Sequence, residues 1–261
     1  MTQSRLPRAA AAVVLAVAAI GVTGCAKTDR ATRADQSYVA RDVETIYNFG
    51  KDTLDKRRYK DAALIFDEVE RQHPYSIWAR RAQLMSAFSY YMARDYQEAT
   101  LAAQRFLSLH PGNKDAPYAY YLIALSYYEQ IIGVERDQKV TQQALDALTE
   151  LVRRYPNTDY ASDARLKIDL ARDHLAGKEM ETGRWYQSQG QYLAAVSRFR
   201  TVIEKYDTTT HVPEALERLV ETYLALGIPE EAKKAAAVLG YNYPGSKWYE
   251  RAHRLVQKHA A

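Results

Sequence analysis

The chain has 261 residues, a formal net charge of +4 at pH 7 and 47% hydrophobic residues. It is therefore long enough for a sizeable core, and it lacks the strong basic excess that is typical of nucleic-acid-binding proteins. The single cysteine excludes an intramolecular disulfide, and 21 tyrosines against five phenylalanines suit surfaces that are partly buried and partly hydrated.

The first 24 residues have the pattern of an export signal. Arg5 and Arg8 form a basic start, and the apolar run 9–20 is too short to cross a bilayer as a helix. The run is followed by Val22-Thr23-Gly24-Cys25, and small residues before a cysteine fit a lipoprotein signal-peptidase site. We predict a lipoprotein signal peptide over 1–24 and an S-diacylglyceryl, N-acyl cysteine at Cys25. An ordinary secretory signal with an incidental cysteine is the alternative.

Residues 25–40 are polar and charged, and we predict a flexible tether between the membrane and the domain. Several acyl chains on Cys25 would hold the protein durably to a membrane. Ala26 follows the cysteine in place of the Asp that commonly retains bacterial lipoproteins at the inner membrane, which permits transport to the outer membrane. Because no later apolar segment approaches 18 residues, we expect the remainder to be periplasmic.

From residue 41 onward the periodicity is helical, and one register recurs five times. An alanine is followed after twelve residues by a proline and after eight more by another alanine. The instances are Ala62/Pro74/Ala82, Ala99/Pro111/Ala119, Ala144/Pro156/Ala164, Ala195/Asp207/Ala215 (with Asp replacing Pro) and Ala232/Pro244/Ala252. A fixed internal period is typical of stacked helix pairs. We predict an all-α solenoid of about five tetratricopeptide (TPR) helix pairs with a C-terminal capping helix.

The register has a physical explanation. Apolar residues around Ala62 follow helical spacing, and a small residue lets two helix axes approach closely. The proline should end the second helix of a pair, and its missing N–H suits entry into the next helix.

The spacing between successive repeats predicts the organisation of the domain. It places repeats one to three in 41–156, with an inserted loop near 130–139, and repeats four and five with the cap in 157–261. A long helix is expected over 158–189, weakened at Gly177 and Gly183.

The sequence contains no recognisable catalytic or metal-binding motif. His73 and His110 precede the repeat proline, where Tyr155 and Tyr243 stand in other repeats, so they are equivalent positions and not a convergent pair. HExxH, GxSxG, Walker A and GxGxxG patterns are missing. Carboxylate pairs such as Asp67 and Glu68 are expected on solvated helix faces. We predict a non-enzymatic protein without a cofactor other than its covalent lipid.

Three stretches carry a family resemblance: Glu70-Arg71-Gln72-His73-Pro74-Tyr75-Ser76, residues 105–111, and Gly133-Val134-Glu135-Arg136-Asp137 in the third repeat. With the lipidation signal and the length, they resemble the BamD family, the lipoproteins of the outer-membrane β-barrel assembly (BAM) machinery. The resemblance covers nearly the whole chain after the signal. It implies an outer-membrane lipoprotein on the periplasmic side that aids assembly and insertion of β-barrel proteins. Its implied partners are the periplasmic domains of BamA, other BAM lipoproteins and unfolded clients that carry a C-terminal β-signal; no nucleic acid is expected.

The resemblance also implies site residues. Arg198 matches the family position that contacts BamA, although Ser197 stands where the family pattern has Asn. A client surface is expected on repeats one to three, where aromatic residues and arginines could attract a peptide carboxylate. Its candidates are Tyr75, Trp78, Tyr91, Tyr118, Tyr121, Tyr128, Arg80, Arg81 and Arg94. The alternative function is a periplasmic TPR scaffold that coordinates peptidoglycan or cell-division proteins.

Overall fold

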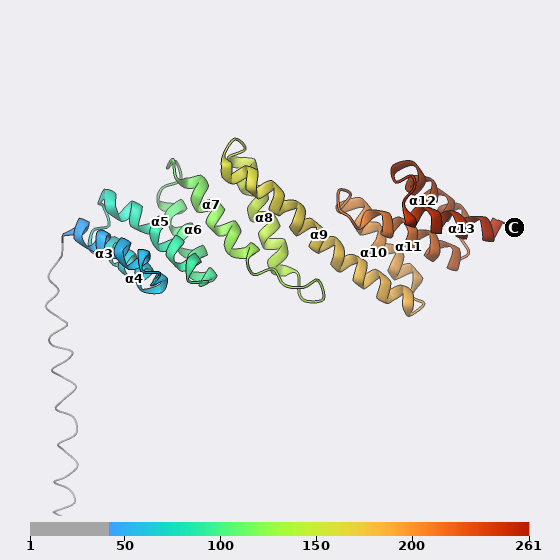
Figure 1. The fold of residues 1–261 in the computed structure, drawn as a ribbon, viewed down its shortest axis with the longest axis horizontal. Coiled ribbons are helices and arrows are strands. Elements are labelled where there is room, and N and C mark those ends of the chain that lie inside the picture. Colours follow the sequence, from blue (N-terminus) through green and yellow to red (C-terminus); the bar gives the residue numbers. More distant parts are fainter. Residues whose placement is uncertain (1–41, 261) are drawn as a thin grey trace, which may run out of the picture. The chain divides into compact units, whose positions relative to one another are not determined.

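The computed structural model describes residues 42–260, and these form eleven α-helices without a strand (Figure 1). The expected signal peptide, Cys25 and the tether lie outside the described residues. The helices are α3 (Val43–Asp55), α4 (Tyr59–Gln72), α5 (Ile77–Met92), α6 (Tyr96–Leu109), α7 (Ala116–Tyr128), α8 (Lys139–Arg154), α9 (Asp159–Ser188), α10 (Tyr192–Lys205), α11 (Val212–Ala225), α12 (Pro229–Asn242) and α13 (Lys247–Ala260).

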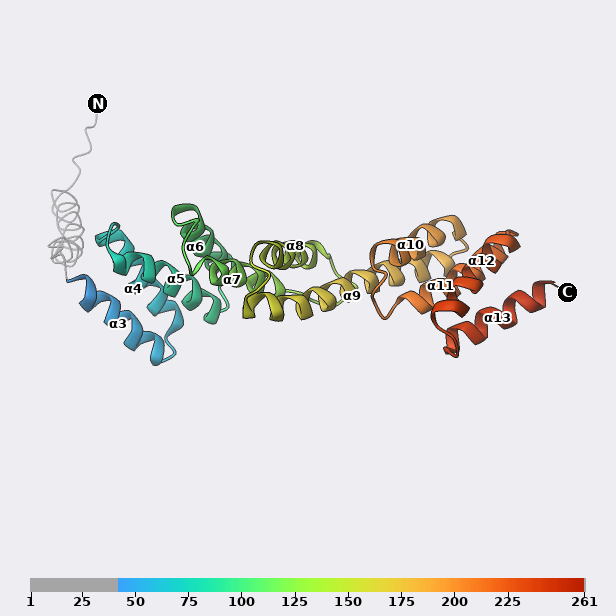
Figure 2. The ribbon, with the colours of Figure 1, turned by 90° about the horizontal axis from the view of Figure 1, so that it is seen from above.

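The helices stack in sequence order, which confirms the predicted fold class. Each helix from α3 to α12 packs against the next, which gives five pairs from α3/α4 to α11/α12 (Figure 2). The first helices of neighbouring pairs also touch, as α3 does with α5, α5 with α7 and α7 with α9. The last helix, α13, packs on α11 and α12 and covers the end of the stack. A repeat protein needs such a cap because its terminal pair would otherwise expose an apolar face.

The repeat prolines stand in the turns between pairs. Helices α4, α6, α8 and α12 end one residue before His73, His110, Tyr155 and Tyr243, each of which has φ near −135° and precedes a proline. Proline disfavours helical geometry in the residue before it, which explains the shared end point. The proline does not open the next helix, however. Pro74 and Pro156 precede the N-caps Ser76 and Thr158, whose hydroxyls accept the first free backbone N–H groups.

Turns within the pairs share a left-handed residue. Arg57, Arg94, Gly190 and Gly227 each lie two residues before the second helix of a pair, with φ of 59°, 60°, 71° and 74°. Three residues separate the two helices in each of these four turns, and left-handed backbone geometry permits so short a reversal. Glycine adopts this geometry freely, whereas arginine does so at a steric cost.

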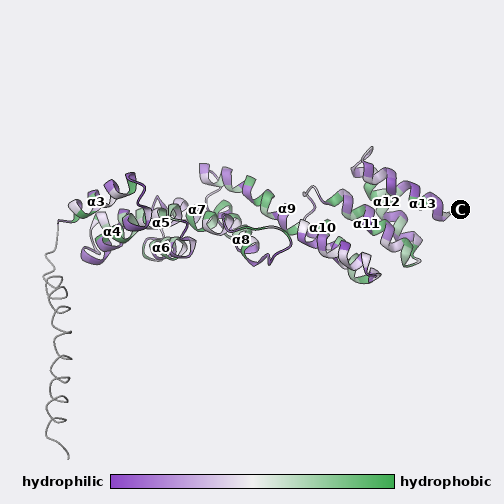
Figure 3. Ribbon diagram, turned by 60° about the horizontal axis from the view of Figure 1, so that its bottom comes forward, coloured by the Kyte–Doolittle hydropathy of each residue, from purple (hydrophilic) through white to green (hydrophobic). Residues whose placement is uncertain are grey.

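The repeat alanines are fully buried, as the register predicts, and side-chain sizes are matched across the helix pairs. An added Cβ at Gly50 would lie 2.7 Å from the ring of Phe66, and at Gly183 it would lie 2.5 Å from the ring of Phe199. Both phenylalanines are fully buried. Figure 3 shows apolar and polar residues alternating along most helices, as expected for helices with one buried face.

The inserted segment, residues 129–138, joins α7 to α8 and docks on the middle of α9. Lys178 Nζ of α9 donates to the backbone oxygen of Glu135 at 3.0 Å, and Val134 lies over Gly177, where an added Cβ would be 3.1 Å from its side chain. Helix α9 runs unbroken through Gly177 and Gly183, so the expected weakening does not interrupt it. At Gly183 the Phe199 ring occupies the space of a Cβ, whereas at Gly177 an added Cβ would make a tight contact with Val134.

Asp67 corrects an expectation of the sequence analysis. Its carboxylate is partly buried and accepts hydrogen bonds from Ser86 Oγ at 2.6 Å and Tyr90 OH at 2.8 Å, so it ties α4 to α5. Burial and this contact raise the pKa of Tyr90.

None of the helices within 42–260 combines the length and apolar composition required to cross a bilayer.

Candidate functional site

A groove of about 700 Å³ extends over the first three repeats to the start of the fourth, at the helices that come first in each pair. Helix α5 contributes its N-terminal half, and α3, the turn between α6 and α7, α7 and the start of α9 complete the wall. The lining residues are Tyr47, Ile77, Arg80, Arg81, Leu84, Met85, Gly112, Asn113, Lys114, Asp115, Tyr118 and Tyr160. The groove therefore combines aromatic and apolar surface with three cationic side chains.

Its aromatic wall is formed by ring contacts between helices. The Tyr47 ring packs on Trp78 with centroids 4.9 Å apart, and Tyr160 packs on Tyr118 and Tyr121 at 5.6 and 5.1 Å. Burial raises the pKa of Tyr118 to about 12, with a smaller contribution from Tyr160. Its hydroxyl is therefore neutral at physiological pH and can donate or accept a hydrogen bond.

The charges at the groove are unbalanced. Arg80, Arg81 and Lys114 face a single carboxylate, that of Asp115. Within residues 42–260 neither arginine forms an ion pair, and the Arg81 guanidinium lies over the Trp78 ring with its carbon 5.5 Å from the centroid. Stacking on an aromatic face leaves the edge of a guanidinium free to bind a planar anion. This edge suits a carboxylate.

The structure brings together part of the surface expected from sequence. Arg80, Arg81 and Tyr118 line the groove, and Trp78 supports it through Tyr47 and Arg81.

The other tyrosines of that surface lie along the same row of helices and are held by polar contacts. Tyr121 OH donates to Asp163 Oδ2 at 2.6 Å, and the Lys167 ammonium lies 5.4 Å from the Tyr128 ring centroid. Tyr91 OH is 3.5 Å from the carboxylate of Glu129. These contacts fix the orientations of the three tyrosines.

Of the six expected residues that do not line the groove, two lie in turns. Tyr75 is fully exposed in the turn between α4 and α5, and Arg94 occupies the left-handed turn at the opposite end of α5 from Arg80.

Sequence reasoning missed Tyr47, Leu84, Met85, Lys114 and Tyr160. The repeat register contained a signal for one of them: Tyr160 lies four residues before Ala164, as Trp78 lies four residues before Ala82. Equivalent positions on successive first helices point to the same side of the stack.

Arg198 lies on α10, in the fourth pair. Its Nη1 is 3.1 Å from Oε2 of Glu179 on α9, and its side chain is 43% exposed, next to the fully buried Phe199. The guanidinium is thus oriented by a carboxylate of its own chain and keeps an accessible edge.

No cluster of three or more His, Cys, Asp or Glu side chains in the described part of the chain could hold a metal ion.

Known proteins of one family are similar in sequence to this chain over most of its length. Residues 39–239 match the family described as YfiO, outer membrane lipoprotein. The chain is 53% identical to the outer membrane protein assembly factor BamD of Caulobacter vibrioides, over 95% of this chain and 81% of that protein. It is 47% identical to the BamD of Rickettsia prowazekii, over 87% of this chain and 91% of that protein.

A more distant relative and a solved structure are also similar. The BamD of Neisseria meningitidis is 33% identical, with 91% of each chain covered. A thermophilic TPR protein of Thermus thermophilus aligns with 83% of this chain and all of its own length, at 19% identity and a TM-score of 0.38. On the strength of the family match and of the relatives at 33–53% identity, this chain belongs to the BamD (YfiO) family of outer membrane lipoproteins.

Proposed function

We propose that this chain binds the C-terminal segment of unfolded β-barrel clients in the groove described above. The chain is a non-enzymatic outer membrane protein assembly factor of the BAM complex and a lipoprotein of the outer membrane. The observation that carries the proposal is the pair of guanidiniums of Arg80 and Arg81, which form no ion pair with another described residue and lie beside an aromatic wall.

The chemistry of the groove matches a chain end that carries an aromatic residue. A carboxylate can receive charge-assisted hydrogen bonds from Arg80 and Arg81, and these are stronger than hydrogen bonds between neutral groups. Tyr47, Tyr118 and Tyr160 offer rings for an aromatic side chain. A volume of about 700 Å³ lies within the range of sites that enclose a small ligand. A peptide of a few residues is therefore a suitable occupant.

Binding of two synthetic peptides tests this assignment. Both end in the same aromatic residue, and one has a free carboxylate while the other has a C-terminal amide. Hydrogen bonds to charged groups contribute about 1.5–3 kcal/mol each, so we expect the free acid to bind at least tenfold more tightly. Arg80→Gln with Arg81→Gln should remove that preference, whereas Arg58→Gln, which alters an exposed pair with Asp61, should keep it. Equal affinity of the two peptides for the wild-type chain would contradict the proposal.

We further propose that Arg198 contacts BamA. The support is its accessible guanidinium edge, its orientation by Glu179 and its match to the family position. Truncating one member of a buried charge pair costs about 2–5 kcal/mol of binding, whereas a contact at the rim costs much less. Arg198→Ala should weaken binding to the periplasmic region of BamA. Arg200→Ala, which removes an exposed pair with Glu204 on the same helix, is the matched control. Equal affinities for both variants and the wild type would leave Arg198 with an intramolecular role alone.

The alternative of a peptidoglycan or cell-division scaffold shares the anchor and the repeats, but the relatives reported above are assembly factors. Affinity purification of the lipidated chain separates the two functions. We expect it to recover BamA and other BAM lipoproteins, and recovery of cell-wall factors in place of BamA would favour the scaffold.

A further inference from the structure

A carboxyl group is buried between the last helix pair and the cap. Glu217 of α11 is fully buried, and it lies two residues after the repeat alanine Ala215. The equivalent positions after Ala82, Ala119 and Ala164 carry Leu84, Tyr121 and Leu166. An acidic residue therefore stands where three other repeats have an aliphatic or aromatic residue, and burying its charge is costly.

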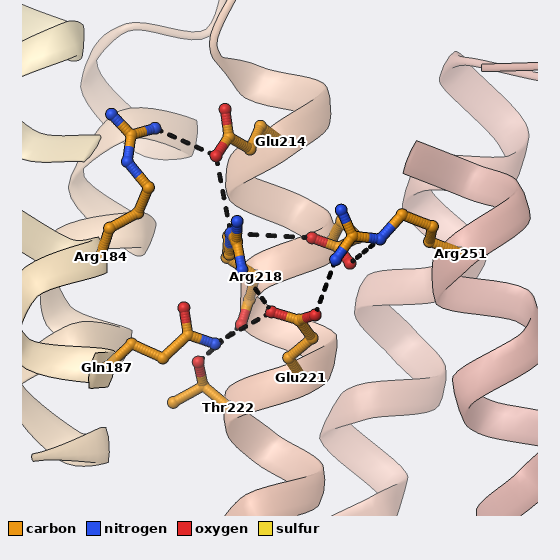
Figure 4. Close-up of polar contacts among 8 residues, drawn as sticks. Arg184, Gln187, Glu214, Arg218, Glu221, Thr222 and Arg251 are labelled. Carbon is orange, nitrogen blue, oxygen red and sulfur yellow. Dashed lines mark hydrogen bonds and ion pairs between the residues drawn. The ribbon is translucent and has the colours of Figure 1, made fainter. Parts of the chain in front are cut away.

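The donors near Glu217 form hydrogen bonds with the carboxylate of the neighbouring Glu221 and not with that of Glu217 (Figure 4). Glu221 accepts from Gln187 Nε2 at 3.0 Å, Arg218 Nη1 at 2.8 Å and Arg251 Nη2 at 3.2 Å. Neither oxygen of Glu217 accepts a hydrogen bond from a described residue. Arg251 Nε comes within 3.2 Å of Glu217 Oε1 and Arg218 Nε within 3.9 Å of Oε2, both without hydrogen-bond alignment.

The charged groups around Glu217 come from three helices. Helix α9 contributes Arg184, which pairs with Glu214 of α11 at 3.0 Å, and α13 contributes Arg251. On α11 itself Arg218 lies near Glu214, Glu217 and Glu221. Within the described residues, no ion pair joins Glu217 to α10 or α12. Two guanidiniums are thus shared among three carboxylates of α11, and Arg184 reaches only Glu214.

Burial is the largest influence on Glu217. Together with the negative charge of Glu221, it raises the pKa of Glu217 to about 7, and the attraction of Arg251 and Arg218 offsets only part of this rise. Helix α13 contributes to the burial, because it packs on α11 and places Arg251 and the buried Ala252 beside it. Undocking of α13 would return the Glu217 carboxyl to water.

We propose that Glu217 is a proton-dependent clasp for the capping helix, so that α13 docks more tightly on α11 when the Glu217 carboxyl is protonated. Among the described helices, α13 packs mainly on α11 and α12, and a terminal helix of this kind can open locally while the other pairs remain folded. Ionisation of Glu217 disfavours the docked state, since only the undocked state hydrates the resulting charge.

The direction of the pH dependence follows from linkage. The pKa of Glu217 is about 7 when α13 is docked and near its usual value of 4.5 when the carboxyl is hydrated. The extra docking stability is therefore fully present below pH 4.5 and is lost as the pH rises through 7. From these two values, the ratio of docked to undocked α13 should be about tenfold greater at pH 6 than at pH 8.

Hydrogen–deuterium exchange of the full lipidated chain in detergent tests the clasp. Protection factors of α13 amides, corrected for intrinsic exchange rates, should rise about tenfold from pH 8 to pH 6. Glu217→Gln, which keeps the shape without a titrating proton, should give a pH-independent profile. Glu230→Gln, which alters an exposed pair with Lys233 on α12, is the control and should retain the wild-type dependence.

A third variant distinguishes ionisation of Glu217 from a general loss of packing as the cause of the pH dependence. Arg251→Gln removes the cation that favours the ionised carboxylate, so the midpoint of the α13 profile should move to higher pH. A wild-type profile that does not change with pH, or a Glu217→Gln profile as steep as that of the wild type, would overturn the proposal. A midpoint that fell in Arg251→Gln would overturn the assigned electrostatic role of Arg251.

Discussion

Gly183 is the position where the packing of the solenoid can be tested with one added methyl group. It lies on α9, and an added Cβ would be 2.5 Å from Cε1 of Phe199 and 2.8 Å from Cδ1. Carbon atoms in contact prefer about 3.5–4.0 Å, so the helices or the ring must shift by about 1 Å. Phe199 is fully buried among the side chains of the C-terminal core.

Two opposing effects set the size of the change in Gly183→Ala. Alanine in place of glycine within a helix stabilises by about 0.5–1 kcal/mol, because glycine loses more conformational entropy on folding. Overpacking a tightly packed site costs about 1–3 kcal/mol. Since the clash is with a buried ring, we expect overpacking to prevail and the variant to lose about 1–2 kcal/mol of unfolding free energy.

Urea unfolding followed by circular dichroism measures this change. Gly112→Ala is a control, because its Cβ would meet no atom within 4 Å. In a double-mutant cycle, Phe199→Leu should relieve part of the cost, with a coupling energy of about 0.5–3 kcal/mol. A Gly183→Ala variant as stable as the wild type or more so would refute the argument that the glycine is required by close packing.

Three further predictions concern the repeat frame and the anchor. Ala195→Leu should destabilise the fourth pair by about 1–3 kcal/mol in the same urea assay, because Ala195 is fully buried between helices, and an unchanged midpoint would contradict this. Gly227→Ala should lower the free energy of unfolding by about 1 kcal/mol compared with the control Gly112→Ala, because φ is 74° at Gly227 and alanine is strained in that geometry. Cys25→Ala should leave an uncleaved or soluble chain, and mass spectrometry that found an unmodified Cys25 in the membrane-bound protein would exclude the anchor.

The stacked helix pairs could be predicted from the sequence because the signals that mark them are local. The alanine register marks the close contacts, and helices end two residues before the proline, because the proline disfavours helical geometry in the residue before it. The long helix, expected over 158–189, runs from Asp159 to Ser188. The packing of its glycines could not be predicted, because it depends on Phe199 and Val134, which lie on other elements and cannot be located from local sequence.

The groove could be predicted only in part. Arg80, Arg81 and Tyr118 were identifiable as polar or aromatic residues of the first helices, but Tyr47 and Tyr160 reach the groove because α3 and α9 lie on either side of α5 and α7. The partners of Asp67 and Glu217 were not foreseeable for the same reason. Both are on helix faces that look solvated in isolation, and the stacking of neighbouring helices determines their burial.

The position two residues after the repeat alanine shows how one frame can carry different functions. Leu84 lines the groove, Tyr121 donates a hydrogen bond to Asp163, and Glu217 is buried beside the cap. The repeat brings each side chain to the same face of a first helix, so the differences arise from the side chain and from the helix that follows. A stack that retains its alanines and prolines can therefore change this position without losing its fold. The proposed functions assign this position to client binding in the first repeats and to the cap in the last.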